Sequence, residues 1–167
     1  MPAPSGFSTI MIHRARVAQL RAKAEQDGAS IAETVERLIS RCMEAGDLPD
    51  ILPEYPVWAK DDGVVSAVLG EIVISAITPT SARKLSQVIR LMATAEEEVR
   101  TRSVALSDES VFAIRRRGKG LVFTRTPEPG ANPAKTAMTM AVDLARQLGK
   151  AAGQATGRTN HSKLGKS

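Results

Sequence analysis

Residues 7–46, FSTIMIHRARVAQLRAKAEQDGASIAETVERLISRCMEAG, place a short strand pattern directly before two short helical patterns. In the first part, apolar and mixed side chains alternate, with Ile10 and Ile12 on one face and Thr9, Met11 and His13 on the other. This period of two predicts a β-strand. A lone strand has two unpaired edges, so the segment needs a partner strand from elsewhere.

Two amphipathic helices are expected after the strand. The first begins at Arg14, places Val17, Leu20 and Ala24 on one side, and stops at the turn and C-cap pair Asp27 and Gly28. The second opens with a capping box, in which Ser30 accepts from the amide of Glu33 while the Glu33 carboxylate accepts from the amide of Ser30. Its apolar stripe consists of Ile31, Val35, Leu38, Ile39, Cys42 and Met43.

One strand and two helices of this length cannot close a hydrophobic core. The economical solution is a second copy of the segment, in which the strands pair antiparallel and the four helices interleave. An alternative stays open, because strand, helix and helix could also be one piece of a larger α+β core.

The segment resembles a ribbon-helix-helix DNA-binding domain of the Arc and methionine-repressor type, and the run AEQDGASIAETVERL at 24–38 is the closest part. The resemblance implies a dimer whose two-stranded ribbon lies in the major groove of double-stranded DNA. It also implies that the outward residues Thr9, Met11 and His13 contact base edges. Met11 departs from the long polar or basic side chain that many members carry there.

Phosphate contacts are expected beside the ribbon. By the same resemblance, the backbone amides of Ala29 and Ser30 at the start of the second helix would hold a phosphate, as helix N-termini do. Arg14 and Arg16 are placed to add further phosphate contacts.

The overall charge agrees with a polyanionic partner, because the chain of 167 residues has a net charge of +5. One cysteine and two histidines argue against a disulfide framework and against a metal site, and we expect no cofactor. No apolar run reaches the length of a membrane span, and residues 1–8 lack the pattern of a secretory signal, so a cytoplasmic location is expected.

Basic residues gather in three places. The first acidic residue is Glu25, so the ribbon end of the chain is basic. A second basic patch consists of Arg115, Arg116, Arg117 and Lys119. Residues 150–167 are basic and contain no acid, which predicts a disordered tail or, alternatively, a non-specific arm for the DNA backbone.

Residues 47–63 are expected to be a linker, because Pro49, Pro53 and Pro56 interrupt regular structure. A second domain then covers residues 64–149. Residues 64–69 and 71–77 are expected to form one long strand or two short strands broken at Gly70, with a helical start as the alternative. We then expect a helix that begins at Thr78 and Pro79, a short strand at 103–106, a hairpin of 111–117 with 121–126, and a last helix that begins at Asn132 and Pro133 and ends at Gly149. This order predicts a two-layer α+β domain with helices on one face of a sheet.

An N-terminal ribbon-helix-helix followed by an α+β domain is similar in outline to nickel-responsive repressors, whose second domain senses metal and assembles tetramers. No histidine lies between Arg14 and Asn160, so only the architecture is carried over. Assembly of dimers into tetramers, a protein partner for residues 64–149, and binding of a small organic effector all stay open.

Motifs for catalysis are missing from the sequence. It has no phosphate-binding loop, no Gly-x-Gly-x-x-Gly after a strand and no Gly-x-Ser-x-Gly, so we expect no enzyme. The interpretation that follows is a double-stranded DNA-binding protein, acting as a dimer or higher oligomer, that serves as a transcriptional repressor, a plasmid partition factor or an accessory protein of a conjugative relaxosome. The alternative is a protein-interaction module, such as an antitoxin or assembly adaptor, whose C-terminal domain binds a partner protein.

Overall fold

The computed structural model describes residues 10–52, 55–94, 100–127 and 132–164, with side chains up to Gly157. These residues form a mixed α+β protein with four helices and two antiparallel sheets. In chain order the elements are α1 Arg14–Gln26, α2 Ile31–Ala45, β1 Val57–Ala59, β2 Val65–Leu69, β3 Ile72–Ile77, α3 Pro79–Thr94, β4 Thr101–Ala105, β5 Val111–Arg117, β6 Gly120–Thr126, β7 Ala134–Ala137 and α4 Met138–Leu164.

The helices α1 and α2 form where the local signals place them. Ser30 and Glu33 make both hydrogen bonds of the expected capping box at the start of α2. Gly46 ends α2 with a left-handed φ of 84°, a conformation that glycine adopts without steric cost. Val17 and Leu20 are half-buried and Ala24 is buried, so the apolar side of α1 faces α2 as expected.

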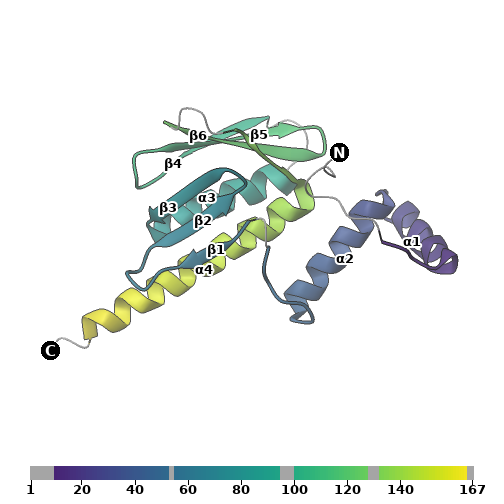
Figure 1. Cartoon of the computed structure of the whole chain (residues 1–167), viewed down its shortest axis with the longest axis horizontal. Helices are drawn as coiled ribbons and strands as arrows, with labels where there is room; N and C mark the ends of the chain where they lie inside the picture. The colour runs from purple at the N-terminus through teal and green to yellow at the C-terminus, as the bar shows by residue number, and fades with distance from the viewer. Residues whose placement is uncertain (1–9, 53–54, 95–99, 128–131, 165–167) are drawn as a thin grey trace.

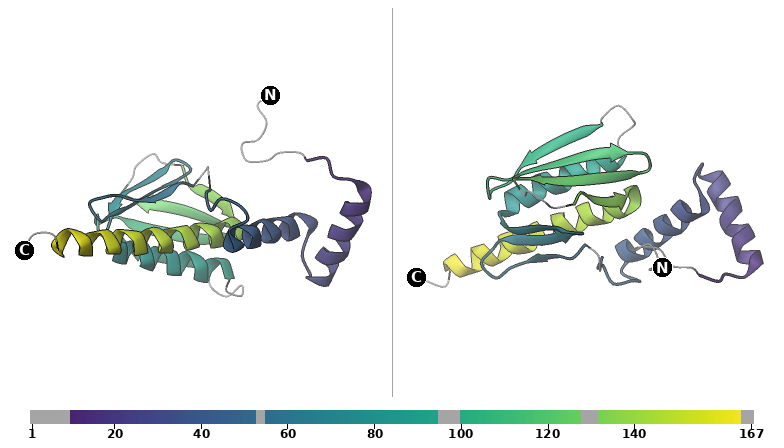
Figure 2. Two further views of the ribbon diagram at one scale, coloured as in Figure 1. Left: turned by 90° about the horizontal axis from the view of Figure 1, so that it is seen from below. Right: turned by 45° about the horizontal axis from the view of Figure 1, so that its top comes forward.

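The rest of the chain builds two sheets beside a pair of long helices (Figure 1). The first sheet has the order β1-β2-β3 and contacts α4, while the second has the order β4-β5-β6-β7 and contacts α3 most. Helices α3 and α4 run side by side under the sheets, and two further views show the same layering (Figure 2). The two-layer α+β architecture is therefore present, but with two sheets in place of one.

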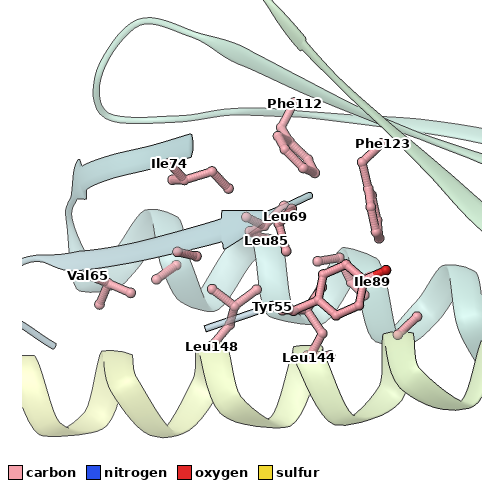
Figure 3. Packing of buried hydrophobic residues seen from close by; sticks show 14 of the residues in the cluster. Tyr55, Val65, Leu69, Ile74, Leu85, Ile89, Phe112, Phe123, Leu144 and Leu148 are labelled. Carbon is pink, nitrogen blue, oxygen red and sulfur yellow. The ribbon is translucent and has the colours of Figure 1, made fainter. Parts of the chain in front are cut away.

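The hydrophobic core lies between the sheets and the α3–α4 pair. Its largest side chains have less than 2% of their surface exposed and come from both sheets and both helices, among them Leu69, Ile74, Leu85, Phe112, Phe123 and Leu144. Figure 3 shows the rings of Phe112 and Phe123 pointing down from the second sheet toward Ile89 and Leu144 of the helices. Burial of each such side chain contributes about 1.5 to 3 kcal/mol, so this cluster holds the two sheets and the helix pair together.

Several predicted elements of the second domain are confirmed. Strands β2 and β3 form a hairpin around Gly70, and β5 and β6 form a hairpin around Gly118. Helix α3 begins at Pro79, and Thr78 Oγ1 accepts from the amide of Ser81 as an N-cap.

Residues 47–63 are more than a linker, because β1 lies within them and pairs antiparallel with β2. Tyr55 explains why this segment is fixed. Its side chain is buried in the core, and its hydroxyl donates a 2.8 Å hydrogen bond to the carbonyl of Lys135 in β7. The aromatic side chain therefore anchors the segment to the second domain, which the proline pattern alone did not indicate.

The predicted boundaries of the last helix were wrong at both ends. Asn132 and Pro133 precede the strand β7, which pairs with β6, and the helix begins only at Met138. The helix also continues through Gly149 to Leu164, so the predicted disordered tail is helical over residues 150–164. A Cβ built at Gly149 would lie 3.4 Å from Ser86 Oγ, so this glycine provides room where α4 crosses α3. Ala151, Ala152 and Ala155, beyond Gly149 in the same helix, are also buried.

Residues 10–13, the described part of the expected ribbon strand, have no regular secondary structure in the single chain. The ribbon-helix-helix arrangement needs a second copy for strand pairing, and no strand among the described residues pairs with this segment.

Candidate nucleic-acid interface

The three residues expected to contact bases, Thr9, Met11 and His13, differ in how the structure places them. Thr9 lies outside the described residues. Met11 is 98% exposed. His13 is the N-cap of α1, and its Nδ1 accepts a 3.3 Å hydrogen bond from the amide of Ala15. The imidazole is thus tied to the start of α1, so a base contact by His13 would need Nε2 or a change of rotamer.

The cations expected to contact phosphate lie on the surface of α1. Arg14 and Arg16 are exposed in its first turn, and Arg16 Nη1 donates a 2.8 Å hydrogen bond to Gln19 Oε1. Lys23, in the last turn, forms a 2.6 Å ion pair with Asp27, and this hydrogen bond lowers the pKa of the Asp27 carboxyl. The N-terminal half of α1 therefore carries cations without a neighbouring acid, while the C-terminal half is neutralised.

The amides of Ala29 and Ser30 already have partners within the chain. The Ala29 amide donates to the Ala24 carbonyl at 2.9 Å, and the Ser30 amide donates to Glu33 Oε2 at 2.7 Å. Geometry therefore favours the next two amides, those of Ile31 and Ala32, as phosphate donors, because the first amides of a helix have no intrahelical acceptor.

Glu33 adds a negative charge to this helix end. Hydrogen bonds from the backbone and side chain of Ser30, together with Lys119, lower the pKa of Glu33 to about 2. The Lys119 ammonium lies 3.2 Å from Glu33 Oε1 and joins the β5–β6 hairpin to the start of α2. At neutral pH the carboxylate is ionised, and it would oppose a phosphate at the same helix end.

The second basic patch is divided by the alternation of β5. Phe112 and Ile114 point into the core, so Arg115 and Arg117 lie on the outer face of the sheet and Arg116 lies on the inner face. Arg116 is half-buried, and its backbone amide donates to the Arg100 carbonyl. Lys119 is paired with Glu33. The four residues are thus not one surface.

Lys135 joins Arg115 on the outer face, and sequence reasoning missed it. Both residues are paired with Val122, Arg115 from β5 and Lys135 from β7, so their side chains flank the same position of β6. Apart from Arg117 and its partner Gly120, the other outward positions in these strands hold alanine, valine, serine and threonine, with no acidic residue. Residues 134–137 were expected to be helical, which concealed this alignment.

The helix α2 docks on α4 through polar contacts. Ser40 Oγ donates a 2.7 Å hydrogen bond to Asp143 Oδ2, and Thr139 Oγ1 donates to Glu36. Asp143 is 4% exposed and also accepts from Arg146 at 2.8 Å. Met43 at the end of α2 joins the main core. The N-terminal helix pair is therefore attached to the second domain by one face of α2.

Several large apolar side chains of the N-terminal segment are open to solvent. Leu38 and Ile39 of α2 are 39% and 45% exposed, and Ile10 is 74% exposed. Three large aliphatic side chains of the N-terminal segment are therefore exposed in the single chain.

No helix within the described ranges is both long and apolar enough to span a membrane. In the same part of the chain, no group of three or more His, Cys, Asp or Glu side chains is arranged to hold a metal ion. Comparisons with protein-family models, with curated proteins and with solved structures give no match for this chain.

Proposed function

We propose that the protein binds double-stranded DNA as a dimer or higher oligomer through residues 7–46. The observation that carries this proposal is the combination, in one segment, of exposed aliphatic side chains at Ile10, Leu38 and Ile39 with an exposed basic turn at Arg14 and Arg16. The aliphatic side chains are suited to contact with a second copy, and the basic turn is suited to the phosphate backbone.

The order of events follows from the strand. Residues 10–13 pair with no strand in the part of the chain that the structure describes, so dimerisation would come first and would pair the two copies of this segment antiparallel. The paired segments would then present Met11 to the major groove, flanked by Arg14 and Arg16 and by the free amides at the start of α2. Repression, plasmid partition and relaxosome assembly all use such binding, and the proposal includes each of these roles.

The proposal is tested with the full chain. Sedimentation should give a dimer or a larger species, and affinity for a random duplex should fall steeply between 50 and 200 mM salt. Arg14→Ala with Arg16→Ala should weaken binding to every duplex and flatten the salt dependence, because phosphate contacts carry no sequence information. The control is Arg90→Ala, an exposed arginine on α3. A monomer that binds no duplex at 50 mM salt would exclude the proposal.

A second candidate function is favoured by the same exposed apolar side chains. Leu38 and Ile39 could be covered by a different protein, as in an antitoxin or an assembly adaptor. In that case the chain would be monomeric alone, and Leu38→Ser with Ile39→Ser would leave its sedimentation unchanged. If the protein is a dimer, the same two substitutions should convert it to monomers.

A further inference from the structure

A cavity of about 280 Å³ lies between α4 and the segment that follows α2. Asp50, Ile51 and Leu52 form one wall, Val57 of β1 closes one side, and Gln147 and Lys150 of α4 form the opposite wall. The segment after α2 runs back toward α4 and β1 (Figure 1). The cavity therefore lies where the N-terminal helices join the second domain.

Gln147 is the most unusual residue of this cavity. Its side chain is 7% exposed, and its Nε2 has no hydrogen-bond partner in the described part of the chain. A buried amide without a partner costs about 1 to 3 kcal/mol. Asp50 Oδ1 also makes no hydrogen bond there, although it lies 3.2 Å from Arg146 Nη2. The Gln147 Nε2 donor is thus left for another molecule, and Asp50 Oδ1 can accept a hydrogen bond in addition to its ion pair with Arg146.

The charges around the cavity balance. Asp50 lies between Arg146 and Lys150, at 3.2 and 3.4 Å, and Arg146 also pairs with Asp143. Two carboxylates and two cations leave no net charge. The cavity therefore favours neither an anion nor a cation over a molecule that carries both a positive and a negative charge. Its apolar part, formed by Ile51, Leu52 and Val57, is suited to an aliphatic group.

We propose that this cavity binds a small zwitterion of the α-amino-acid type with an aliphatic side chain. The carboxylate accepts from Gln147 Nε2 and from Lys150 Nζ, the ammonium group donates to Asp50 Oδ1, and the side chain packs on Leu52 and Val57. This arrangement gives Gln147 Nε2 a hydrogen-bond partner, gives Asp50 Oδ1 a hydrogen bond in addition to its ion pair, and keeps the local charge at zero.

A chain of contacts connects this cavity to α2. The consequence for DNA binding rests on the proposed function. Asp50 follows the C-cap Gly46 of α2, and Arg146 links Asp50 to Asp143, which holds Ser40 of α2. A ligand ammonium at Asp50 weakens the hold of Asp50 on Arg146 and thereby changes how α2 docks on α4. DNA affinity then depends on the concentration of the amino acid.

The binding test uses the full chain without DNA and three probes of similar size: L-leucine, 3-methylbutylamine and 4-methylpentanoate. L-leucine at ten times its Kd should raise the Tm by about 3 to 6 °C. The amine and the carboxylate each lack one charged end and should bind at least about tenfold more weakly. If none of the three raises the Tm at millimolar concentration, or if all three bind alike, the proposal is wrong.

Variants locate the site. Gln147→Met and Lys150→Met should each weaken L-leucine binding about tenfold or more by calorimetry, while Gln87→Met, at an exposed position of α3, should not. Lys150 is 58% exposed, so its variant remains informative if Gln147→Met fails to fold. Unchanged affinity in Lys150→Met contradicts the proposal. DNA binding is measured separately, so a protein that binds L-leucine but no DNA contradicts only the proposed function.

Discussion

Ser40 of α2 and Asp143 of α4 are joined by a 2.7 Å hydrogen bond across an interface between segments that lie far apart in the chain. Asp143 is the centre of this contact, because it also accepts from Arg146, whose side chain is 24% exposed. A carboxylate that is nearly buried and bonded from two helices holds α2 in one position relative to the second domain.

Asp143→Ala should release α2 from α4. The substitution leaves Arg146 with Asp50 alone and Ser40 without an acceptor, and we expect a loss of roughly 3 kcal/mol in the free energy of unfolding. Urea denaturation measures that loss, and hydrogen exchange of α2 amides should accelerate relative to that of α3. Asp47→Ala, at an exposed position after α2, is the control and should change neither quantity. Unaltered exchange of α2 in Asp143→Ala would contradict the docking role.

Ser30→Ala should destabilise the protein by about 1 kcal/mol. The hydroxyl accepts a 3.2 Å hydrogen bond from the Glu33 amide, and an alanine at the N-cap leaves that amide without its acceptor. Denaturation in urea gives the difference, with Ser103→Ala, an exposed serine in β4, as a control of the same chemistry. Equal stability of the two variants would show that the cap contributes nothing.

The stability that Glu33 provides should depend on pH. Its pKa in the folded chain is about 2, below the ordinary value of 4.5, so its contribution is complete above pH 4.5 and is lost as the pH falls toward 2. Comparison with Glu33→Gln should therefore give a difference in unfolding free energy of about 1 kcal/mol at pH 6 that disappears near pH 2, after allowance for solvent screening. A difference that is constant from pH 6 to pH 2 would contradict this assignment.

Ala76→Gly should stabilise the protein. Ala76 has a φ of 53° at the irregular pairing of β2 with β3, and a side chain in this region costs about 1 to 2 kcal/mol. Glycine removes that cost but loses more entropy on folding. We therefore expect the free energy of unfolding, measured by thermal denaturation, to rise by about 0.5 to 1 kcal/mol. Ser75→Gly, one residue earlier in the same strand, should instead be destabilising. If both glycines lower the Tm, the backbone at Ala76 is not strained.

Local signals predicted much of the fold, and long-range pairing accounts for the differences. The capping box at Ser30 and the glycine at 46 act over a few residues, so the sequence alone is sufficient to place α2. By contrast, β7 exists because Ala134–Ala137 pairs with β6, although its own residues are compatible with a helix. Gly149 lies inside α4 for a similar reason, since the crossing with α3 favours a small residue there.

The candidate site also combines features that local sequence signals indicate with features that depend on long-range contacts. The capping box already implies that the Ser30 amide is bonded to Glu33, so the sequence could have directed attention to the next amides. The cavity at Gln147 and Asp50 had no such signal, because these residues meet only after the second domain has folded. Strand alternation alone could have separated Arg116 from Arg115 and Arg117, because Phe112 and Ile114 mark the inner face of the same strand.

Glu33→Gln should tighten the proposed DNA complex. The ionised carboxylate lies at the N-terminal end of α2, where the amides of Ile31 and Ala32 would meet a phosphate, and a glutamine can still accept from the Ser30 amide without the negative charge. We expect affinity for every duplex to rise about threefold at 50 mM salt and by less at 200 mM, because salt screens the removed repulsion. Glu44→Gln, at the exposed opposite end of α2, removes the same charge and should have a smaller effect. If the two variants gain affinity equally, net charge explains the result and the start of α2 does not lie near a phosphate.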